Sequence, residues 1–236
     1  MYKKKKIIAV IPARIGSKGL KKKNIKNFIN KPLFLWPAKA ALKSKYIDKV
    51  VVSSDSKQIV NLSKTNKIES PFLRPKNLST DNAKSIDVII HTIKFYENRK
   101  EFFDYLILLE PTSPLTDNKD IDNAIKKMIN NTRADTLVSI YPAINNHPNY
   151  LFKKNRNNFL KNNILTSKFT RRQDLDKVYY LDGSLYIGKI KYLKKYKTFT
   201  GKKTLGFVMD KIKSFEIDDK IDLSIVQLLY KKYYEK

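Results

Sequence analysis

The stretch IIAVIPARIGSKGLKKKN, from Ile7 to Asn24, decides the fold class of this chain. Its first five residues are apolar and mostly β-branched, which is typical of a short buried strand, and Pro12 cannot continue that strand as a central ladder partner. The following loop contains Gly16 and Gly19, which permit close backbone approach, and a dense group of cations. These cations are Arg14, Lys18, Lys21, Lys22 and Lys23. A buried strand that leads into such a loop predicts a polyphosphate-binding site, although a solvated basic loop would carry the same charges.

Strands and helices alternate along most of the chain. Apolar runs predict buried strands at Lys49–Asp55, Tyr105–Leu109 and Thr136–Ile140. Apolar periodicity predicts helices at Leu35–Ser44, Gln58–Asn66, Ile86–Glu97 and Asp117–Asn130. This alternation predicts an α/β fold with three layers, in which helices cover both faces of a mostly parallel twisted sheet. Ligands bind beyond the carboxyl ends of the strands in such sheets, so the loops after Ile11, Val52 and Leu109 should share one rim.

Length and composition indicate one enzyme-sized domain. The chain of 236 residues can bury a single core, so we expect one domain over residues 1–236. Cysteine is absent, which excludes disulfides, thiolate metal sites and cysteine nucleophiles, and two histidines are too few for a histidine-rich metal site. Pro12 and Arg14 interrupt the apolar run after Lys3–Lys6 too early for a secretory signal, and no apolar run is long enough to span a membrane. We therefore expect a cytoplasmic protein.

The formal charge of +27 raises the question of nucleic-acid binding. Lysines occur in nearly every segment and do not gather with aromatic residues into one stripe, which is typical of a solvated, lysine-biased surface. We therefore expect no specific nucleic-acid partner, only weak adsorption at low salt. A noncatalytic nucleic-acid-binding protein is the alternative from a different functional class.

The glycine spacing in the opening loop fits neither a P-loop nor the dinucleotide fingerprint. The loop instead resembles the opening motif I-P-A-R-G-G-S-K-G-x-x-x-K-N of the acylneuraminate cytidylyltransferase family, which includes CMP-sialate, CMP-legionaminate and CMP-Kdo synthetases. Ile15 stands where that family usually has its first glycine. The resemblance implies a Rossmann-like nucleotidyltransferase fold that binds CTP. It assigns nucleotide binding to Ala13, Arg14, Ser17, Lys18, Gly19, Lys23 and Asn24.

Two further segments resemble motifs of the same family. Leu73–Asp81, with Ser85 just beyond it, resembles L-R-P-x-x-L-A-x-D-x-x-S. The resemblance assigns Arg74, Asp81 and Ser85 to the nucleotide. Arg74 offers a planar donor fork that suits cytosine or phosphate, although a surface salt bridge would use the same fork. The segment LLEPTSPL resembles L-L-Q-P-T-S-P-L-R; Glu110 replaces the usual Gln and Thr116 the usual Arg, and the resemblance places Glu110, Thr112 and Ser113 near the sugar.

The alternation of predicted strands and helices stops between Tyr141 and Thr200. We expect an insertion over about residues 145–200, which the resemblance identifies as a protruding dimerisation arm; an irregular insertion is the alternative. Within it, the segment that begins at Arg171 resembles R-R-Q-D-L-P-x-x-x-R-P-N-G, which assigns five residues to sugar binding. These are Arg171, Arg172, Gln173, Tyr180 and Asp182. Tyr180 stands where the family usually has Arg, and Asp182 where it usually has Asn. Together with Glu110 in place of Gln, these substitutions predict a sugar other than standard N-acetylneuraminate.

The segment Ser214–Leu223 resembles S-x-D-I-D-T-x-x-D-L. Alternation on a strand would place Glu216 and Asp218 on one side, as oxygen ligands of a hard cation require, and we expect them to bind Mg²⁺. The alternative is an acidic helix N-terminus at Asp218 and Asp219, stabilised by the helix dipole.

The matches together imply an enzyme that activates a 3-deoxy-2-ulosonic acid of the nonulosonate class with CTP, giving the CMP-sugar and pyrophosphate. A triphosphate needs Mg²⁺ and fixed cations around its α-phosphorus, and we expect Arg14, Lys23 and Asp218 to be the catalytic residues. The expected partners are CTP, the acidic sugar and a second copy in a homodimer. A nucleotidyltransferase for another sugar or for an alditol is the nearer alternative.

Overall fold

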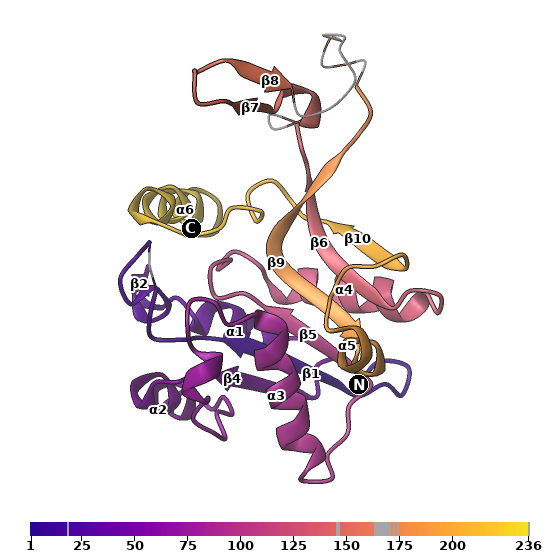
Figure 1. Cartoon of the computed structure of the whole chain (residues 1–236). Helices are drawn as coiled ribbons and strands as arrows, with labels where there is room; N and C mark the ends of the chain where they lie inside the picture. Colours follow the sequence, from indigo (N-terminus) through magenta and orange to yellow (C-terminus); the bar gives the residue numbers. More distant parts are fainter. Residues whose placement is uncertain (18, 145–146, 163–170, 172, 174, 236) are drawn as a thin grey trace.

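The computed structural model describes residues 1–236 except 18, 145–146, 163–170, 172, 174 and 236. Within these residues the body of the protein is built on one six-stranded sheet, in the order β10-β6-β9-β5-β1-β4 (Figure 1). Its strands are β1 (Ile7–Pro12), β4 (Lys49–Ser53), β5 (Tyr105–Leu109), β6 (Thr136–Pro142), β9 (Tyr179–Lys189) and β10 (Thr204–Val208).

The sheet is mostly parallel, as predicted. β1 is parallel to both of its neighbours, and Val10 lies opposite Val51 of β4 and Leu108 of β5. β6 and β10 are also parallel. β9 runs antiparallel between β5 and β6 and so joins the two parallel parts of the sheet.

The strand β1 continues one residue further than predicted. Pro12 is its last residue and lies opposite Ser53, and the N–H of Ala13 then donates to the Ser53 carbonyl at 2.9 Å. The prediction that the strand stops at Ile11 was wrong by one residue, because a residue without an N–H is tolerated at a strand end.

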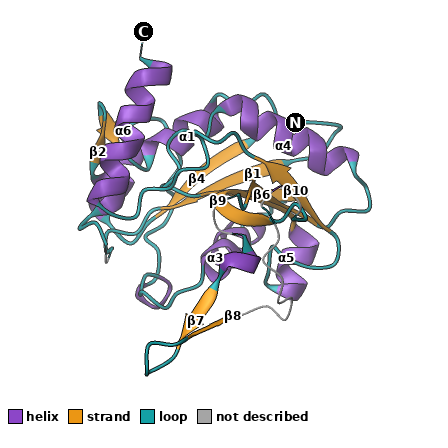
Figure 2. Ribbon diagram, turned by 90° about the horizontal axis from the view of Figure 1, so that it is seen from above, coloured by secondary structure: helices purple, strands orange, loops and turns teal. Residues whose placement is uncertain are grey.

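Helices cover both faces of the sheet (Figure 2). α1 (Leu35–Leu42) and α4 (Asn118–Asn130) pack on one face, and α3 (Ser85–Glu97) and α5 (Ile190–Tyr196) on the other. The alternation of side chains along β1 produces the two interfaces, because successive side chains point to opposite faces. Ile7, Ala9 and Ile11 belong to the first core cluster, and Ile8 and Val10 to the second.

Two further helices and several short elements complete the fold. α2 (Lys57–Thr65) follows β4, and α6 (Lys220–Tyr234) packs through Leu223 and Val226 on the segment after β1. The short elements are η1 (Lys23–Ile25), η2 (Lys76–Leu78), η3 (Pro148–Tyr150), β2 (Asn27–Phe28), β3 (Lys31–Pro32), β7 (Phe152–Lys154) and β8 (Leu160–Asn162). No helix in the described ranges is long and apolar enough to cross a membrane.

The expected insertion over residues 145–200 includes parts of the body. β9 supplies a central strand and α5 covers one face of the sheet, so the chain from Tyr179 onward does not form a separate insertion. The ends of β6 and β9 leave the body as a two-stranded ribbon, in which Tyr141 pairs with Tyr180 and Pro142 with Tyr179. Beyond this ribbon, the hairpin β7–β8 stands away from the body (Figure 1).

Candidate active site

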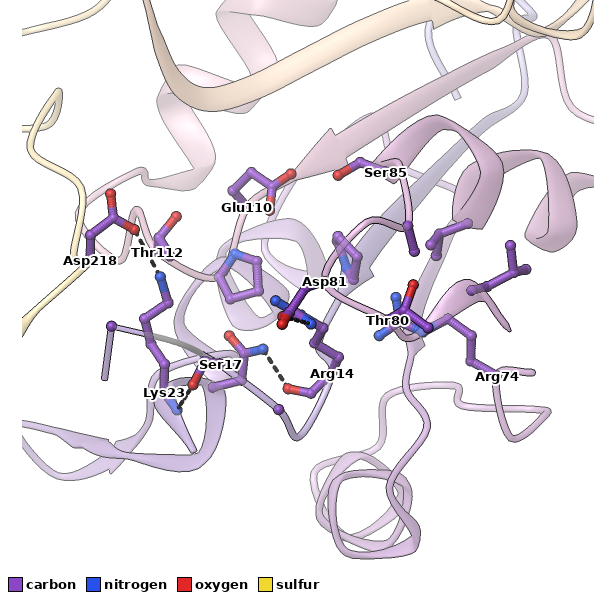
Figure 3. A pocket seen from close by; sticks show the side chains of 18 residues that line it. Arg14, Ser17, Lys23, Arg74, Thr80, Asp81, Ser85, Glu110, Thr112 and Asp218 are labelled. Atoms are coloured by element: carbon purple, nitrogen blue, oxygen red, sulfur yellow. Dashed lines mark hydrogen bonds and ion pairs between the residues drawn. The ribbon is translucent and has the colours of Figure 1, made fainter. Parts of the chain in front are cut away.

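A cavity of about 490 Å³ opens at the carboxyl ends of β1 and β5 (Figure 3). Its walls come from four segments that are far apart in sequence: the loop after β1, residues 74–88, the turn after β5, and the residue before the cap of α6. The lining residues are Pro12, Arg14, Gly16, Ser17, Gly19, Lys23, Asn24, Arg74, Leu78, Thr80, Asp81, Ala83, Ser85, Val88, Glu110, Pro111, Thr112 and Asp218. The loops after Ile11 and Leu109, which were predicted to share one rim of the sheet, both line the cavity. The loop after Val52 does not line it, but it contacts the loop after β1 through a hydrogen bond from the Ile15 N–H to Asp55.

Polar side chains in the loop after β1 hold the loop in shape. The Asn24 amide donates to the Arg14 carbonyl at 2.8 Å, and the Lys23 N–H donates to Ser17 Oγ at 3.0 Å. The Ser17 hydroxyl itself donates to the Leu20 carbonyl. Ala13 is fully buried in the core and does not line the cavity, so its predicted nucleotide contact is absent from the cavity wall. Lys18 lies outside the described residues.

Two cations of this loop are already paired with carboxylates (Figure 3). Arg14 Nη1 lies 2.6 Å from Asp81 Oδ1, and Lys23 Nζ lies 2.9 Å from Asp218 Oδ1. Residues predicted to bind the nucleotide and the metal therefore form ion pairs with each other. Exposed pairs of this kind contribute little to stability, so an incoming triphosphate can replace the carboxylates at low cost.

Arg74 is the buried cation of the cavity. Only 5% of it is exposed, and its Nε and Nη2 atoms have no hydrogen-bond partner in the part of the chain that the structure describes. Burial lowers the pKa of Arg74, and Arg14 lowers it further, whereas Asp55 and Glu110 oppose this shift. Buried donors without a partner are rare in proteins and indicate a missing acceptor. Asp55, which sequence reasoning did not single out, also accepts the Ile15 N–H at 2.9 Å and so fixes the start of the loop.

Three acidic residues gather on the opposite side of the site. Burial raises the pKa of Glu110 to about 7, with a further contribution from the negative charge of Glu216. Burial likewise raises the pKa of Glu216 to about 7, with contributions from Asp218 and Asp182. Burial also raises the pKa of Asp182, whose Oδ2 atom has no hydrogen-bond partner. This side of the site therefore favours a proton, a cation or a hydrogen-bond donor over a further negative charge.

Two glycines make room for the acidic segment. A Cβ atom on Gly183, which has a φ of +75°, would lie 1.4 Å from Glu216 Oε1. A Cβ atom on Gly19 would lie 2.5 Å from the Asp218 carbonyl oxygen. Gly16, in contrast, has no atom within 4 Å of its would-be Cβ. The close approach predicted for the loop glycines thus holds for Gly19 and not for Gly16.

The segment that carries Glu216 and Asp218 is not a strand. It is an irregular connection before α6, with Ile217 fully buried between the two carboxylates. The Ile217 N–H donates to the Thr112 carbonyl at 2.9 Å, which ties the segment to the turn after β5. Asp219 caps α6 by accepting the N–H groups of the first turn, so the helix-capping alternative applies to Asp219. The side chain of Asp218 is 73% exposed and meets Lys23.

The residues predicted to bind the sugar are only partly brought together. Thr112 and Glu110 line the cavity, whereas Ser113 is fully buried, does not line it, and has an Oγ atom without a hydrogen-bond partner among the described residues. The sugar contact of Ser113 stays a prediction. Tyr180, which is 42% exposed, lines a separate cavity of about 290 Å³. The other residues around that cavity are Tyr141, Pro142, Ala143, Ile144, Lys211, Ser214 and Phe215.

The remaining sugar-side residues either line neither cavity or lie outside the described residues. Asp182 is buried beside Glu216 and Ser139, and Arg171 and Gln173 are exposed and line neither cavity. Arg172 lies outside the described residues. Sequence reasoning missed Leu78, Thr80, Ala83 and Val88 in the cavity wall. Leu78 and Thr80 belong to the segment Leu73–Asp81, so that motif itself carried the signal for them.

Carboxylates could hold a metal ion only together with a ligand from outside the protein. Among the described residues, no group of three or more His, Cys, Asp or Glu side chains is arranged to hold a metal ion. Glu216 and Asp218 therefore supply at most two protein ligands. Mg²⁺ is commonly bound in this way, by one or two carboxylates, water and substrate phosphates.

Comparison with known proteins gives a consistent result. A family model described as cytidylyltransferase matches residues 8–233. An N-acylneuraminate cytidylyltransferase of Escherichia coli is 32% identical over 229 residues, which are 96% of this chain and 52% of the relative, so the chain spans about half of that protein. A CMP-N,N'-diacetyllegionaminic acid synthase of Legionella pneumophila is 32% identical over 95% of this chain and 96% of its own length. A pseudaminic acid cytidylyltransferase of Campylobacter jejuni is 32% identical over 98% of both chains.

Solved structures share the fold at lower sequence identity. A CMP:2-keto-3-deoxy-manno-octonic acid synthetase in complex with CTP superimposes with a TM-score of 0.70 at 16% identity, and covers 96% of this chain and 99% of its own. A cytidylyltransferase from Leptospira borgpetersenii gives a TM-score of 0.64 at 16% identity, over 98% of this chain and 90% of its own. The expected Rossmann-like nucleotidyltransferase fold is confirmed.

Proposed function

The chain belongs to the cytidylyltransferase family, and from this membership we propose that it transfers CMP from CTP to the anomeric hydroxyl of a nonulosonic acid, with release of pyrophosphate. The observation that carries the proposal is the cavity at the carboxyl ends of β1 and β5. It combines a cationic loop, a buried guanidinium with two nitrogen atoms that have no hydrogen-bond partner among the described residues, and an acidic segment. A nucleoside triphosphate needs the cationic loop and the buried guanidinium to offset its negative charge. A metal ion needs the carboxylates of the acidic segment as ligands.

The nucleotide fits the basic part of the cavity. The unpartnered Nε and Nη2 atoms of Arg74 would donate to the cytosine carbonyl and ring nitrogen or to a phosphate oxygen. Leu78 and Val88 offer apolar contacts beside them. Ser85 opens α3, whose first N–H groups favour an anion at that end of the helix. Arg14 and Lys23 then meet the phosphates in place of Asp81 and Asp218.

Mg²⁺ fits the donor set of the acidic segment. Glu216 and Asp218 present hard oxygen ligands, and triphosphate oxygens would complete the coordination. Lys23 pairs with Asp218 in the structure, so the lysine is in place to take up a phosphate when the carboxylate turns to the metal ion. Bound Mg²⁺ would offset the negative charge of the triphosphate and of the departing pyrophosphate.

The reaction is a displacement at the α-phosphorus. The anomeric hydroxyl oxygen of the sugar bonds to that phosphorus while the bond to the bridging oxygen of the leaving group breaks. Pyrophosphate leaves with the bonding electrons, and the hydroxyl proton passes to solvent. Arg14 and Lys23 hold the phosphates in line and stabilise the charge that develops on the leaving group.

The acidic side of the site sets the class of sugar that the protein accepts. Glu110, Tyr180 and Asp182 replace the Gln, Arg and Asn of the sialate enzymes that the chain resembles, which removes one positive charge and adds two carboxyl groups. We propose that the sugar carries nitrogen substituents, as legionaminate and pseudaminate do, which donate hydrogen bonds to Glu110 or Asp182. The aromatic side chains Tyr180 and Phe215 would pack on the substituents. The alternative is that lysines such as Lys177 restore the charge balance and sialate is still accepted.

We further propose that the active protein is a cytoplasmic homodimer. Arg171 and Gln173 lie outside the cavity of their own chain, and a second copy could bring such residues to the site. Their charge and amide groups suit the carboxylate of the sugar. Cytoplasmic CTP would then supply the nucleotide.

The test is a substrate panel with pyrophosphate release as the readout. We expect release only when CTP, Mg²⁺ and a nonulosonic acid are all present. Legionaminate or pseudaminate should give a kcat/KM at least about tenfold above that of N-acetylneuraminate or Kdo, the difference expected from one lost hydrogen bond to a buried polar group. A preference for N-acetylneuraminate would show that the three substitutions do not govern sugar choice. Release with a sugar phosphate and not with any ulosonic acid would contradict the proposed function.

A further inference from the structure

A second cavity, of about 260 Å³, shares no lining residue with the candidate active site. It lies between α1, α6 and the turn that leads into α4. Three lysines and three aromatic residues give it its chemical character: Lys31, Lys39, Lys43, Trp36, Tyr230 and Tyr234. We call it the lysine–aromatic cavity.

The positive charge of the lysine–aromatic cavity is uncompensated. Lys39 and Lys43 stand four residues apart along α1 and its C-cap, a spacing at which like charges repel. Within the described residues, none of the three lysines forms an ion pair. Burial lowers the pKa of Lys31, and Lys39 and Lys43 lower it further. An anion in the cavity would remove this repulsion.

The carboxylate that lines this cavity is engaged elsewhere. Asp117 lines the cavity, but its side chain caps α4 by accepting the Lys119 and Asp120 N–H groups at 2.8 Å and 3.0 Å. It also lies 2.7 Å from the Lys213 ammonium. Asp117 therefore does not neutralise the lysine cluster.

Aromatic rings form a continuous wall beside the lysines. Lys31 Nζ lies 3.7 Å from the centre of the Trp36 ring, in cation–π geometry. Trp36 and Tyr230 are in edge contact at 5.0 Å between ring centroids, and Tyr230 stacks on Tyr234 at 5.7 Å. Tyr234 is partly exposed, so its outer face can accept a further ring.

We propose that the lysine–aromatic cavity binds a phosphate ester of a planar ring compound, of which a nucleoside monophosphate is the simplest example. The three lysines are sufficient to neutralise the charge of about −2 on one phosphate monoester, and aromatic side chains are the usual stacking partners of bases. The cavity has about half the volume of the active-site cavity, so it suits a smaller ligand than the triphosphate proposed for that site.

The bound ligand would contact elements that also build the active site. The turn that places Thr112 in the active-site cavity continues directly into Pro114 and Leu115 of the second cavity. α6 begins just after Asp218 and ends with Tyr234. The two sites therefore share a turn but no lining residue, and the helix that lines the second cavity begins two residues after Asp218 of the first.

The fluorescence of Trp36 reports on this cavity directly, because it is the only tryptophan in the 236-residue chain. AMP titrated into the full chain should change that fluorescence saturably. The double variant Lys39→Gln/Lys43→Gln should weaken AMP binding by about tenfold, as expected from the loss of two partly exposed charge contacts. Lys57→Gln/Lys64→Gln, which removes two exposed lysines from α2, is the matched control and should bind AMP as the unmodified chain does.

If the change in Trp36 fluorescence came from AMP bound in the active site, the two sets of variants would show the opposite pattern. The variant Arg14→Ala should keep the Trp36 response, because Arg14 does not line the second cavity. Loss of the response in Arg14→Ala with retention in Lys39→Gln/Lys43→Gln would overturn the proposal. An absent response at millimolar AMP, or equal affinity for AMP and inorganic phosphate, would also overturn it. Tyr234→Ala, at a partly exposed position, tests the ring contact without removing charge and should weaken AMP but not phosphate.

Discussion

At the scale of single residues, two cations of the site form ion pairs with carboxylates, and substrate phosphates can replace these carboxylates. Arg14 is held by Asp81 at 2.6 Å and Lys23 by Asp218 at 2.9 Å. The pairs keep the long side chains aimed at the cavity, so less side-chain entropy is lost when phosphate binds. The sequence predicted all four residues for the site but could not predict that they pair, because Lys23 and Asp218 are 195 positions apart.

Removal of either cation should impair transfer strongly. We expect Arg14→Ala and Lys23→Ala each to lower kcat/KM by about 10² or more, because loss of a positioned charge at a transferring phosphoryl group typically costs roughly 3 kcal/mol. Steady-state pyrophosphate release measures the effect. Arg133→Ala removes an exposed arginine in the turn before β6 and should leave kcat/KM unchanged. Near-normal turnover in both loop variants would remove the loop from the mechanism.

The raised pKa of Glu110 should appear in the pH dependence of stability. Its pKa is about 7 in the folded protein, above the ordinary value of 4.5, mainly because of burial. Between these values the unfolded chain loses the proton and the folded chain keeps it, so the free energy of unfolding falls as pH rises. The substitution Glu110→Gln removes the titrating group and with it this decrease in the free energy of unfolding. We expect the variant to be about 1 to 3 kcal/mol more stable than the unmodified protein at pH 8, and nearly equal to it at pH 4.

Urea denaturation at the two pH values measures this difference. Glu235→Gln changes an exposed carboxylate near the end of the chain and serves as the control, with little effect at either pH. An equal stability gap between the Glu110 variant and the unmodified protein at pH 4 and pH 8 would contradict the raised pKa.

At the scale of elements, the two carboxylates just before α6 have different roles, structural for Asp219 and, in our proposal, functional for Asp218. Asp219 caps the helix, and Asp218 faces Lys23. Asn caps helices about as well as Asp, so both Asp218→Asn and Asp219→Asn should unfold at nearly the same temperature as the unmodified protein. We expect Asp218→Asn alone to raise the Mg²⁺ concentration needed for half-maximal activity, by tenfold or more, because the amide loses the charge that binds a hard cation. Full activity of Asp218→Asn at limiting Mg²⁺ would exclude it as a ligand.

Gly183 should be essential to the position of Glu216. Gly183→Ala places a methyl group at a φ of +75° and against Glu216 Oε1, so we expect a loss of about 2 kcal/mol in the free energy of unfolding. Gly16→Ala is the matched control for stability, because no atom lies within 4 Å of its new methyl group. Denaturant titration compares the two. Equal stability of both variants would show that the chain around Glu216 relaxes freely.

The elements that the sequence predicted well are those with one clear apolar pattern. The strand Tyr105–Leu109 was predicted with its observed bounds, and Asp117 was correctly placed at the start of α4. β9 was not recognised as a central strand, because Asp182, Gly183 and Ser184 interrupt its apolar pattern. Asp182 and Gly183 lie beside Glu216, so two of the residues that hide the strand belong to the acidic side of the site.

The sequence predicted which segments form the candidate site, but it did not predict which residues in those segments contact one another. The opening loop, Arg74 and the turn after β5 were predicted to meet, and they do. The burial of Ser113 was not predictable, because a motif does not state which side of a turn is buried. Asp55 was overlooked because its role, to accept the Ile15 N–H, depends on two loops that lie together only in the folded chain.

At the scale of the whole molecule, exposed apolar residues gather where the chain leaves the body. The ribbon formed by the ends of β6 and β9 exposes Ile144, Tyr179, Tyr180 and Leu181. A protein with a formal charge of +27 repels its own copies at long range, so association needs a contact of this apolar kind. The ribbon is the natural contact for the homodimer proposed above.

Mutation of the ribbon should abolish that dimer. Leu181 is 49% exposed on the ribbon, and Leu228 is 67% exposed on α6. We expect the unmodified protein and Leu228→Asp to be dimers, and Leu181→Asp to be a monomer, since a carboxylate in an apolar interface loses its hydration. Light scattering coupled to gel filtration measures the masses. A monomeric unmodified protein at micromolar concentration would contradict the prediction.

The position of β9 has a consequence for biosynthesis. β6 and β10 contact the rest of the sheet only through β9 among the described strands, and β9 begins at Tyr179. While the ribosome is still making the chain up to that point, the edges of β5 and β6 both remain unpaired, and unpaired edges invite aggregation. The nascent chain therefore cannot complete its sheet until the residues from Tyr179 onward are synthesised. A premature stop before Tyr179 should yield a product that depends on chaperones or is degraded, even though most of the nucleotide cavity has already been encoded.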